Sequence, residues 1–400
     1  MAGPARTCTG FRRVSHRQPT GRTARSLCAV PARPILDRCP SALRPYTSKD
    51  GAIVRARVPG GEVALDALDR FLAVGERWGA PFVQLTTRAN LQVRALPDPV
   101  PDEAVAAVMA TGWFPSASHE RARNILRDPL ASHLQPVVDA LDETLCATPE
   151  LASLPGRFLF LVTDASGVAL DQPWDLAWRR MADGSGQVLA RGPQGVFCRP
   201  CAPERAPEVL TGLAARFLGI RVERQWNVRD LGPDSDFFSE LTATTIAPAE
   251  PLRPGPVAGS DALIAGLPLG LLDRTALDAL RAVTDQVTLT PWRSLLVPGG
   301  AAHTEALPAA GLSTAPAQVW SHLSACTGAP WCANGQADVM GLARESARLV
   351  QREGRALARN VHLVACERRC GAQDGELVLL SPTDVTDAVG VADALTEGHR

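Results

Sequence analysis

The chain has 400 residues, of which 46% are hydrophobic and 21% charged, and its formal net charge is -1. It is too long for one ordinary core, so two domains or a duplicated domain are expected. The near-zero net charge argues against broad electrostatic binding to nucleic acid or to an anionic membrane. Because no apolar run approaches the roughly 20 residues of a membrane-spanning helix, we expect a cytoplasmic protein.

The N-terminal 36 residues hold seven Arg and no Asp or Glu. This composition suits a disordered basic tail, although an acid-free start with Arg and Ser is also typical of a transit peptide. We favour the tail, because the apolar core of a secretion signal is missing. Lys49 is the only lysine in the chain, so a single Arg carries little information without further support.

The first predicted unit is strand, helix, strand. A strand-like run at 51–58 (GAIVRARV) precedes Gly60-Gly61 and an amphipathic helix with Leu65, Leu68, Phe71 and Leu72 on one face. The segment 84–94, QLTTRANLQVR, is predicted as the second strand. Strand periodicity of two places one polar set on a single face: Thr86, Arg88, Asn90, Gln92 and Arg94. Periodicity alone leaves open whether this face is solvated or forms the wall of a polar site.

The same order recurs later in the chain. The text ALDAL stands at 64–68 and again at 276–280, and TTRANLQV aligns without gaps with TPWRSLLV at 290–297. In that alignment Trp292 stands opposite Arg88 and Arg293 opposite Ala89, so Arg293 need not do what Arg88 does. A helical stripe at 134–145 leads to a strand at 157–162, and a weaker one at 339–350 leads to a strand at 360–366. The sequence therefore predicts an internal duplication.

Four close cysteines near the C-terminus carry the strongest chemical signal. They are Cys326 and Cys332 in CTGAPWC, and Cys366 and Cys370 in CERRC. Four thiolates suffice for a 4Fe-4S cluster or a structural zinc, and the five-residue gap in the first pair favours the cluster. Four buried free cysteines remain the plain alternative. Cys198 and Cys201 form a weak C-x-x-C signal with no assigned role.

These two cysteine motifs, in the second half of a duplicated chain, resemble the sulfite and nitrite reductase superfamily. Within it, five blocks resemble the precorrin-3B synthase family: CPSALRPYTSKDGAIVRARVPGG at 39–61, LTTRANLQVRAL at 85–96, RARNILRDPLA at 121–131, LPGRFLFLVTD at 154–164 and TPWRSLLVP at 290–298. The resemblance implies an α+β fold of two ferredoxin-like half-domains and two larger α/β half-domains around a pseudo-twofold axis.

Domain boundaries follow from this resemblance and from a proline-rich stretch at 246–259. The expected parts are a basic tail at 1–38, a ferredoxin-like half-domain at 39–110, a larger half-domain without a cluster at 111–245, a linker at 246–259, a second ferredoxin-like half-domain at 260–315, a cluster-binding half-domain at 316–392 and a tail at 393–400.

The resemblance implies an oxidoreductase. The expected reaction is the oxygen-dependent hydroxylation of precorrin-3A at ring carbon 20, with formation of a gamma-lactone, to give precorrin-3B in aerobic cobalamin biosynthesis. The implied cofactors are a 4Fe-4S cluster on Cys326, Cys332, Cys366 and Cys370 and a separate non-haem iron. The implied partners are precorrin-3A or a related tetrapyrrole, O2, and an electron-donating reductase with NADH as the ultimate electron source. No His pattern places the ligands of the non-haem iron, and His119 is the first that we would test.

Carboxylates fringe a precorrin ring, and Arg supplies planar, bidentate hydrogen bonding to carboxylates. The resemblance indicates Arg88, Arg123 and Arg157 as substrate-binding residues, with Asn90, Gln92 and Asn124 as orienting groups. Leu159 stands where the reductases carry a second anion-binding Lys. That replacement weakens the case for sulfite or nitrite reduction.

Two alternatives stay open. One is a sirohaem-dependent sulfite or nitrite reductase, in which Cys370 would also bridge to the sirohaem iron. The other is a protein that binds and hands on a tetrapyrrole, with a purely structural cluster. The Glu367-Arg368-Arg369 run between Cys366 and Cys370 differs from the Gly and Lys usual in the superfamily, and could change the potential of the cluster.

Overall fold

The structure is a computed structural model that describes residues 39–247, 249–332, 334–372 and 375–397. These residues all belong to one unit, Pro34–Arg400. The predicted basic tail at 1–38 lies outside the described residues. Within the described ranges, no helix has the length and hydrophobicity that a membrane span requires.

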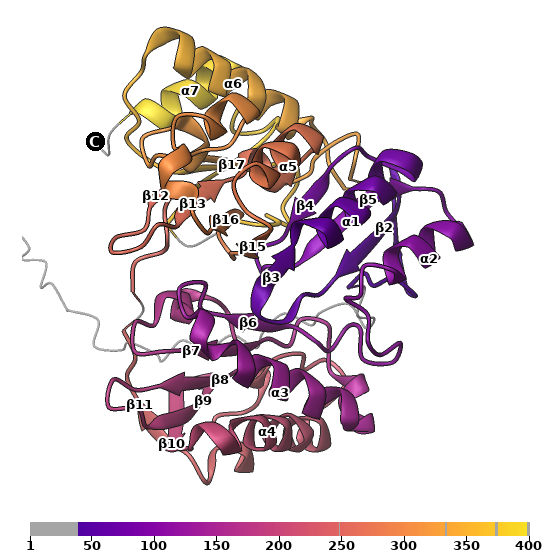
Figure 1. Cartoon of the computed structure of the whole chain (residues 1–400), viewed down its shortest axis with the longest axis vertical. Coiled ribbons are helices and arrows are strands. Elements are labelled where there is room, and N and C mark those ends of the chain that lie inside the picture. Colours follow the sequence, from indigo (N-terminus) through magenta and orange to yellow (C-terminus); the bar gives the residue numbers. More distant parts are fainter. Residues whose placement is uncertain (1–38, 248, 333, 373–374, 398–400) are drawn as a thin grey trace, which may run out of the picture. The chain divides into compact units, whose positions relative to one another are not determined.

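Two five-stranded sheets are built on the same plan from the two parts of the chain (Figure 1). The first sheet has the spatial order β1 (Tyr46–Ser48), β2 (Gly51–Ala56), β5 (Leu91–Leu96), β4 (Val83–Leu85) and β14 (Leu271–Leu272). The second has the order β12 (Gly255–Pro256), β13 (Leu263–Gly266), β16 (Ser294–Val297), β15 (Gln286–Leu289) and β3 (Glu62–Ala64). All neighbouring strands in both sheets are antiparallel. Each sheet therefore takes one edge strand from the other copy.

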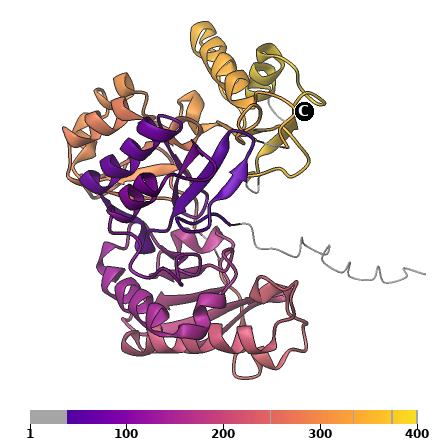
Figure 2. The ribbon, with the colours of Figure 1, turned by 90° about the vertical axis from the view of Figure 1, so that its right-hand side faces the viewer.

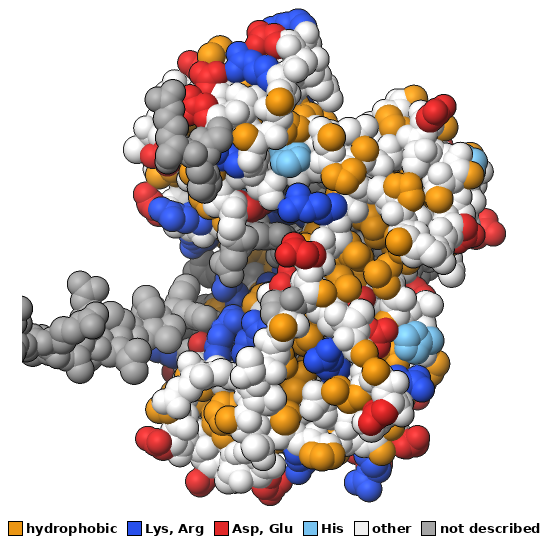
Figure 3. Space-filling model, turned by 90° about the vertical axis from the view of Figure 1, so that its left-hand side faces the viewer, with side chains coloured by type: hydrophobic (Ala, Val, Ile, Leu, Met, Phe, Trp, Pro, Cys, Tyr) orange, Lys and Arg blue, Asp and Glu red, His pale blue; other side chains and the backbone are white. Residues whose placement is uncertain are grey.

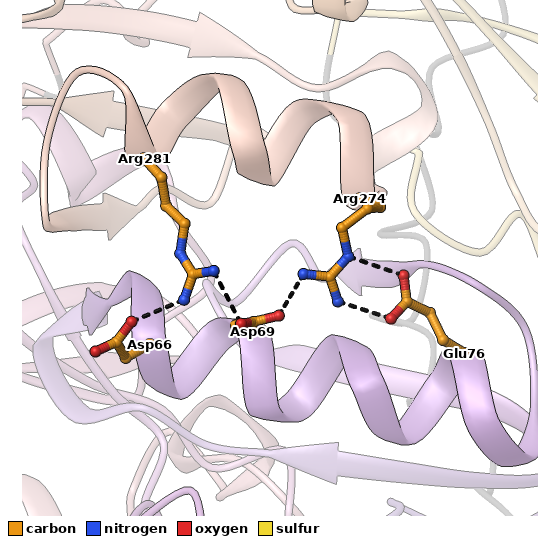
Figure 4. A network of polar contacts seen from close by, with 5 residues as sticks. All are labelled: Asp66, Asp69, Glu76, Arg274 and Arg281. Carbon is orange, nitrogen blue, oxygen red and sulfur yellow. Dashed lines mark hydrogen bonds and ion pairs between the residues drawn. The ribbon is translucent and has the colours of Figure 1, made fainter.

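Helices α1 (Leu65–Trp78) and α5 (Arg274–Arg281) follow the exchanged strands. The predicted apolar face of α1 is confirmed, since Leu65, Leu68, Phe71 and Leu72 are all buried. An ion-pair network joins the two helices on their polar faces (Figure 4). Arg274 forms ion pairs with Asp69 and with Glu76, the latter at an N–O distance of 2.7 Å. Arg281 forms ion pairs with Asp66 at 2.7 Å and with Asp69 at 2.9 Å.

Each of the two remaining sheets contains three neighbouring parallel strands. The larger has the order β11 (Thr242–Thr244), β10 (Gly195–Pro200), β9 (Gly186–Gly192), β8 (Leu176–Arg180), β7 (Phe160–Thr163) and β6 (Ile125–Arg127), and the smaller has β17 (Leu323–Ala325), β18 (Val361–Val364) and β19 (Leu377–Leu380). Strands β6, β7 and β8 are parallel, as are β17, β18 and β19. The chain leaves both first strands in the same way, because the Asp128 amide donates to Val162 O and the Cys326 amide to Leu363 O.

Helices pack against each of these parallel cores. Helices α3 (Gln135–Ala147) and α4 (Ala206–Ile220) contact each other and the larger sheet. Helices α6 (Val339–Glu353) and α7 (Ala388–Thr396) contact each other and the smaller one (Figure 2). The remaining helix, α2 (Asp102–Met109), packs on α1. The duplicated α+β architecture is therefore confirmed, whereas the exact domain boundaries stay predictions.

The segment QLTTRANLQVR is not one strand, as its alternation predicts, but a hairpin. Strand β4 ends at Leu85, residues 86–90 turn, and β5 begins at Leu91. Ala89 adopts a left-handed φ of 51°, and the Thr86 amide closes the turn by donating to Asn90 O at 2.9 Å. The predicted polar face survives only for Gln92 and Arg94, which share one side of β5. Thr86, Arg88 and Asn90 are placed by the turn instead.

Candidate functional site

The fold brings the four predicted cluster cysteines together. Cys326 directly follows β17, and Cys366 comes two residues after β18, so both lie at the same end of a parallel sheet. Burial raises the pKa of the Cys326 thiol, and the charges of Cys370 and Cys332 raise it further. Burial likewise raises the pKa of Cys370, with Cys366 and Cys332 adding to the effect. Each thiol of the quartet is thus in electrostatic reach of others in the set.

Backbone groups surround this quartet. The Ala365 amide donates to Cys326 Sγ at 3.3 Å, and the amide of Gly328 also donates to it. His362 Nε2 lies 3.0 Å from Cys370 O, and Ser324 Oγ lies 2.7 Å from His362 Nδ1. Burial, aided by the nearby Arg293 guanidinium, lowers the pKa of His362 to about 3. A neutral His362 can therefore donate from Nε2 to the Cys370 carbonyl.

The donor set fits a 4Fe-4S cluster, because four thiolates are its usual ligands. Nowhere in the described ranges do three His, Cys, Asp or Glu side chains converge closely enough to hold a single metal ion. A cluster of four irons is larger than one ion, so its ligands stand further apart. The ligands of the predicted non-haem iron remain unassigned. His119 is buried with Nδ1 near Ser116 and Ser118 and with Nε2 3.1 Å from Thr148 O, which is the pattern of a structural histidine.

The charges of two other arginines, Arg55 and Arg157, act on Arg88, and sequence reasoning named only Arg88 and Arg157 of these three. Burial lowers the pKa of Arg88, and the charges of Arg55 and Arg157 lower it further, while Cys39 and Asp175 oppose them. Arg88 Nε is buried without a hydrogen-bond partner among the described residues. Arg157 is exposed, lies over the Trp226 ring at 5.4 Å, and its charge offsets part of the rise in the pKa of Cys370. A buried arginine that lies within the field of other cations favours binding of an anion.

Two predicted orienting residues form a buried link beside this arginine cluster, which we define as Arg55, Arg88 and Arg157. Asn124 Oδ1 accepts from Asn90 Nδ2 and from Arg57 Nε, both at 3.0 Å. Asn124 Nδ2 donates to Gly156 O at 2.9 Å, next to Arg157. Asn90 and Asn124 therefore tie the β4–β5 turn to the segment that carries Arg157.

Gln92 holds the third cation. Its Oε1 accepts from Arg55 Nε at 3.2 Å and from Arg55 Nη2 at 2.8 Å, and its Nε2 donates to Gln84 Oε1 at 2.6 Å. Arg55 and Gln92 face each other across β2 and β5. Arg55 was missed in the sequence because its strand, GAIVRARV, offered two arginines and no criterion to choose between them.

Arg123 is placed differently from the prediction. Its guanidinium forms a two-pronged ion pair with Asp142 on α3, with Nε–Oδ1 at 2.7 Å and Nη2–Oδ2 at 2.6 Å, and Nη1 donates to Trp113 O at 2.6 Å. All its donor nitrogens thus serve internal contacts. This geometry points to a structural role for Arg123.

Asp175 is a buried acid whose charge acts on Arg88. Leu159 N, Asn227 Nδ2 and Val228 N donate to its carboxylate at 2.8–3.0 Å. Burial nevertheless raises the pKa of Asp175 to about 6. The backbone of Leu159 thus helps to hold this acid.

On the face shown in Figure 3, Lys and Arg side chains lie among acidic and hydrophobic ones. A cavity of about 380 Å³ lies beside residues 290–294, where β16 begins, and its walls include Trp292, Arg293, Trp320, His322 and Glu376. The predicted substrate residues do not line it.

The C-x-x-C signal has a simple explanation, because Cys198 packs against one hydrophobic core and Cys201 against another. Both thiols are free.

Comparison with known proteins relates the chain to one family model, one named synthase and one solved structure. Residues 46–110 match the nitrite/sulfite reductase ferredoxin-like half domain. The chain is 25% identical over 414 aligned residues to a Sinorhizobium protein named precorrin-3B synthase, covering 90% of this chain and 88% of that protein. It also matches the structure of the Mycobacterium tuberculosis NirA protein with a TM-score of 0.60 at 17% identity, covering 80% of this chain and 69% of that one.

The structural match supports the fold alone, whereas the Sinorhizobium relative, named as a synthase, supports an enzyme. The resemblance to precorrin-3B synthase, and more broadly to the sulfite and nitrite reductase superfamily, is therefore confirmed.

Proposed function

We propose that the protein hydroxylates precorrin-3A at ring carbon 20 in an oxygen-dependent reaction that forms precorrin-3B with its gamma-lactone. In such a reaction one atom of O2 enters the substrate and the other leaves as water, using two electrons and two protons. NADH would supply the electrons through a reductase. The observation that carries the proposal is similarity to a precorrin-3B synthase over 90% of the chain.

The arginine cluster supports this substrate. The charges of Arg55 and Arg157 both act on buried Arg88, whose Nε has no hydrogen-bond partner among the described residues, and a buried cation of this kind costs free energy until an anion arrives. The peripheral carboxylates of a precorrin supply that anion. Asn90, Gln92 and Asn124 would orient the cluster rather than touch the substrate, because their side chains already bond to other protein groups.

Four residues would hold the 4Fe-4S cluster: Cys326, Cys332, Cys366 and Cys370. When bound, a 4Fe-4S cluster supplies one-electron transfer. Arg157 would link substrate binding to the 4Fe-4S cluster, because its charge acts on both Arg88 and Cys370. Leu159 is buried and apolar, so it offers no cation to a sulfite or nitrite anion.

A test combines spectroscopy with turnover. Protein purified without oxygen is expected to show broad iron-sulfur absorption and no sirohaem bands. With precorrin-3A, O2 and a reductant, it is expected to give a product one oxygen atom heavier over many turnovers. Intense sirohaem bands would instead favour the reductase alternative, and tetrapyrrole binding without turnover would favour a carrier.

A further inference from the structure

An arginine of the first sheet reaches the loop between the first two cysteines of the quartet. Arg94 lies on β5, and its Nη1 donates to Thr327 Oγ1 at 2.9 Å. Its Nη2 donates to the carbonyl of Trp331, the residue before Cys332. Ser48 Oγ donates to the same carbonyl at 3.2 Å. The first copy of the duplicated chain thus grips both ends of the segment 327–331.

The grip is fixed from behind by a buried acid. Arg94 Nε and Nη2 bind the two carboxylate oxygens of Asp50 at 2.7 and 3.1 Å. The side chains of Arg94 and Asp50 are 3% and 1% exposed. A planar guanidinium held on two sides by a carboxylate has a fixed direction, so its remaining donors act as a rigid template.

The loop itself has few other anchors of this kind. The Ala329 amide donates to Ala337 O at 2.8 Å, and a Cβ on Gly328 would meet Ala337 O at 2.7 Å. These contacts hold the middle of the loop against its own half of the chain. Arg94 holds the residues next to each cysteine from the opposite half.

We propose that Arg94 is a positioning residue that, held by Asp50, sets the placement of Cys326 and Cys332 for the cluster. The inference rests on the proposed function, because it takes these cysteines as cluster ligands. It extends that function by making the ferredoxin-like half-domain a support of a cluster that the other half binds. Supporting groups of this kind tune both metal affinity and electronic properties.

The test compares three variants of the full chain. Arg94→Gln removes the template, and Thr327→Val removes one acceptor with little change in shape. Arg127→Gln is the matched control, because Arg127 is also a buried arginine that pairs with an acid, Glu62 at 3.0 Å, and its hydrogen bonds and ion pairs among the described residues involve no cysteine. The readouts are iron and sulfide per chain, the electron paramagnetic resonance spectrum of the reduced cluster, its reduction potential, and thermal stability.

We expect Arg94→Gln to hold less than about half the wild-type iron, with an altered spectrum in what remains. Thr327→Val should keep its iron but change the spectrum or the potential. Arg127→Gln should lose stability while its spectrum stays as in the wild type.

Unchanged spectra and iron content in both Arg94→Gln and Thr327→Val would overturn the inference, as would an equal loss of iron in Arg127→Gln. A wild-type protein without any iron-sulfur signal would instead overturn the cluster assignment and with it the proposed function.

Discussion

The two turns at 86–90 and 290–294 have the same backbone and different chemistry. In each, a threonine amide donates across the turn, from Thr86 to Asn90 O at 2.9 Å and from Thr290 to Ser294 O at 3.0 Å. In each, the fourth residue has a left-handed φ, 51° at Ala89 and 55° at Arg293. The ungapped sequence alignment is therefore also the structural one.

The guanidinium sits one residue later in the second turn, and this decides what it does. Arg88 belongs to the arginine cluster, whereas its counterpart Trp292 lines the cavity of the second copy. Arg293 turns instead to the second cysteine loop and donates to Gly371 O at 2.5 Å. The difference shows how one frame supports an anion site in one copy and a loop brace in the other.

The largest expected effect concerns Asp175, the acid that precedes β8; the acid at the same place before β19 in the second copy is Glu376. Asp175 has a folded pKa of about 6 against 3.8 unfolded, so the folded state binds the proton more tightly. Its contribution to stability is present below about pH 4 and is lost as the pH rises through 6, by about 3 kcal/mol. Chemical denaturation at pH 4 and pH 7 measures this loss, and Asp175→Asn should remove that part of the pH dependence. An unchanged pH dependence in Asp175→Asn would contradict the assignment.

Arg88→Gln should weaken binding of a carboxylate-rich tetrapyrrole about 100-fold, because a desolvated charge pair is lost. Fluorescence titration with uroporphyrin measures this, at low and at high salt. Trp292→Phe, at the same place in the second turn, should change the affinity by less than about 2-fold. Comparable losses in the two variants would break the proposed division between the copies.

Arg293→Met should act on the cysteine loop and spare the tetrapyrrole. Losing one hydrogen bond from a charged donor is expected to speed iron release to a chelator about 10-fold. Absorbance of the iron-chelator complex follows the release, and uroporphyrin titration serves as the comparison. Weaker binding of the tetrapyrrole with normal iron retention would reverse the roles assigned to the two arginines.

The smallest expected effect lies where the copies meet through α1 and α5. Arg274→Ala removes its pairs with Asp69 and Glu76, which are partly exposed and therefore screened by salt. We expect a loss of about 1 kcal/mol or less at low salt, shrinking further at high salt. Thermal unfolding at two ionic strengths tests this, and a larger loss at high salt would contradict it.

Much of the fold follows from the sequence, because its apolar periodicity is strong. The buried face of α1 and the duplication were predicted from Leu65, Leu68, Phe71 and the recurring ALDAL text. The turn at 86–90 was not, because polar and apolar residues alternate through it as they would in a strand. What breaks the strand is the left-handed backbone at Ala89, a conformation for which Ala gives no signal.

The site was predictable in type but not in partners. Cysteine spacing grouped Cys326, Cys332, Cys366 and Cys370, whereas ion pairs that join distant segments leave no local pattern. Arg123 forms an ion pair with Asp142, and Arg94 forms one with Asp50. In both pairs the acid lies on a different segment of the chain from the arginine. For this reason the sequence indicated Arg123 as a substrate-binding residue and gave Arg94 only a place on the polar face of a predicted strand.

The exchange of β3 and β14 has a consequence for how the chain folds. Strand β3 pairs with β15 through Ala64 and Gln286, so neither sheet can close before more than half the chain has been synthesised. Pairing across such a separation carries a loop-closure cost and slows folding. The first half released alone would carry an unpaired edge on β4, which is a site for wrong association. Two fragments cut near residue 250 should therefore assemble only when they are produced together.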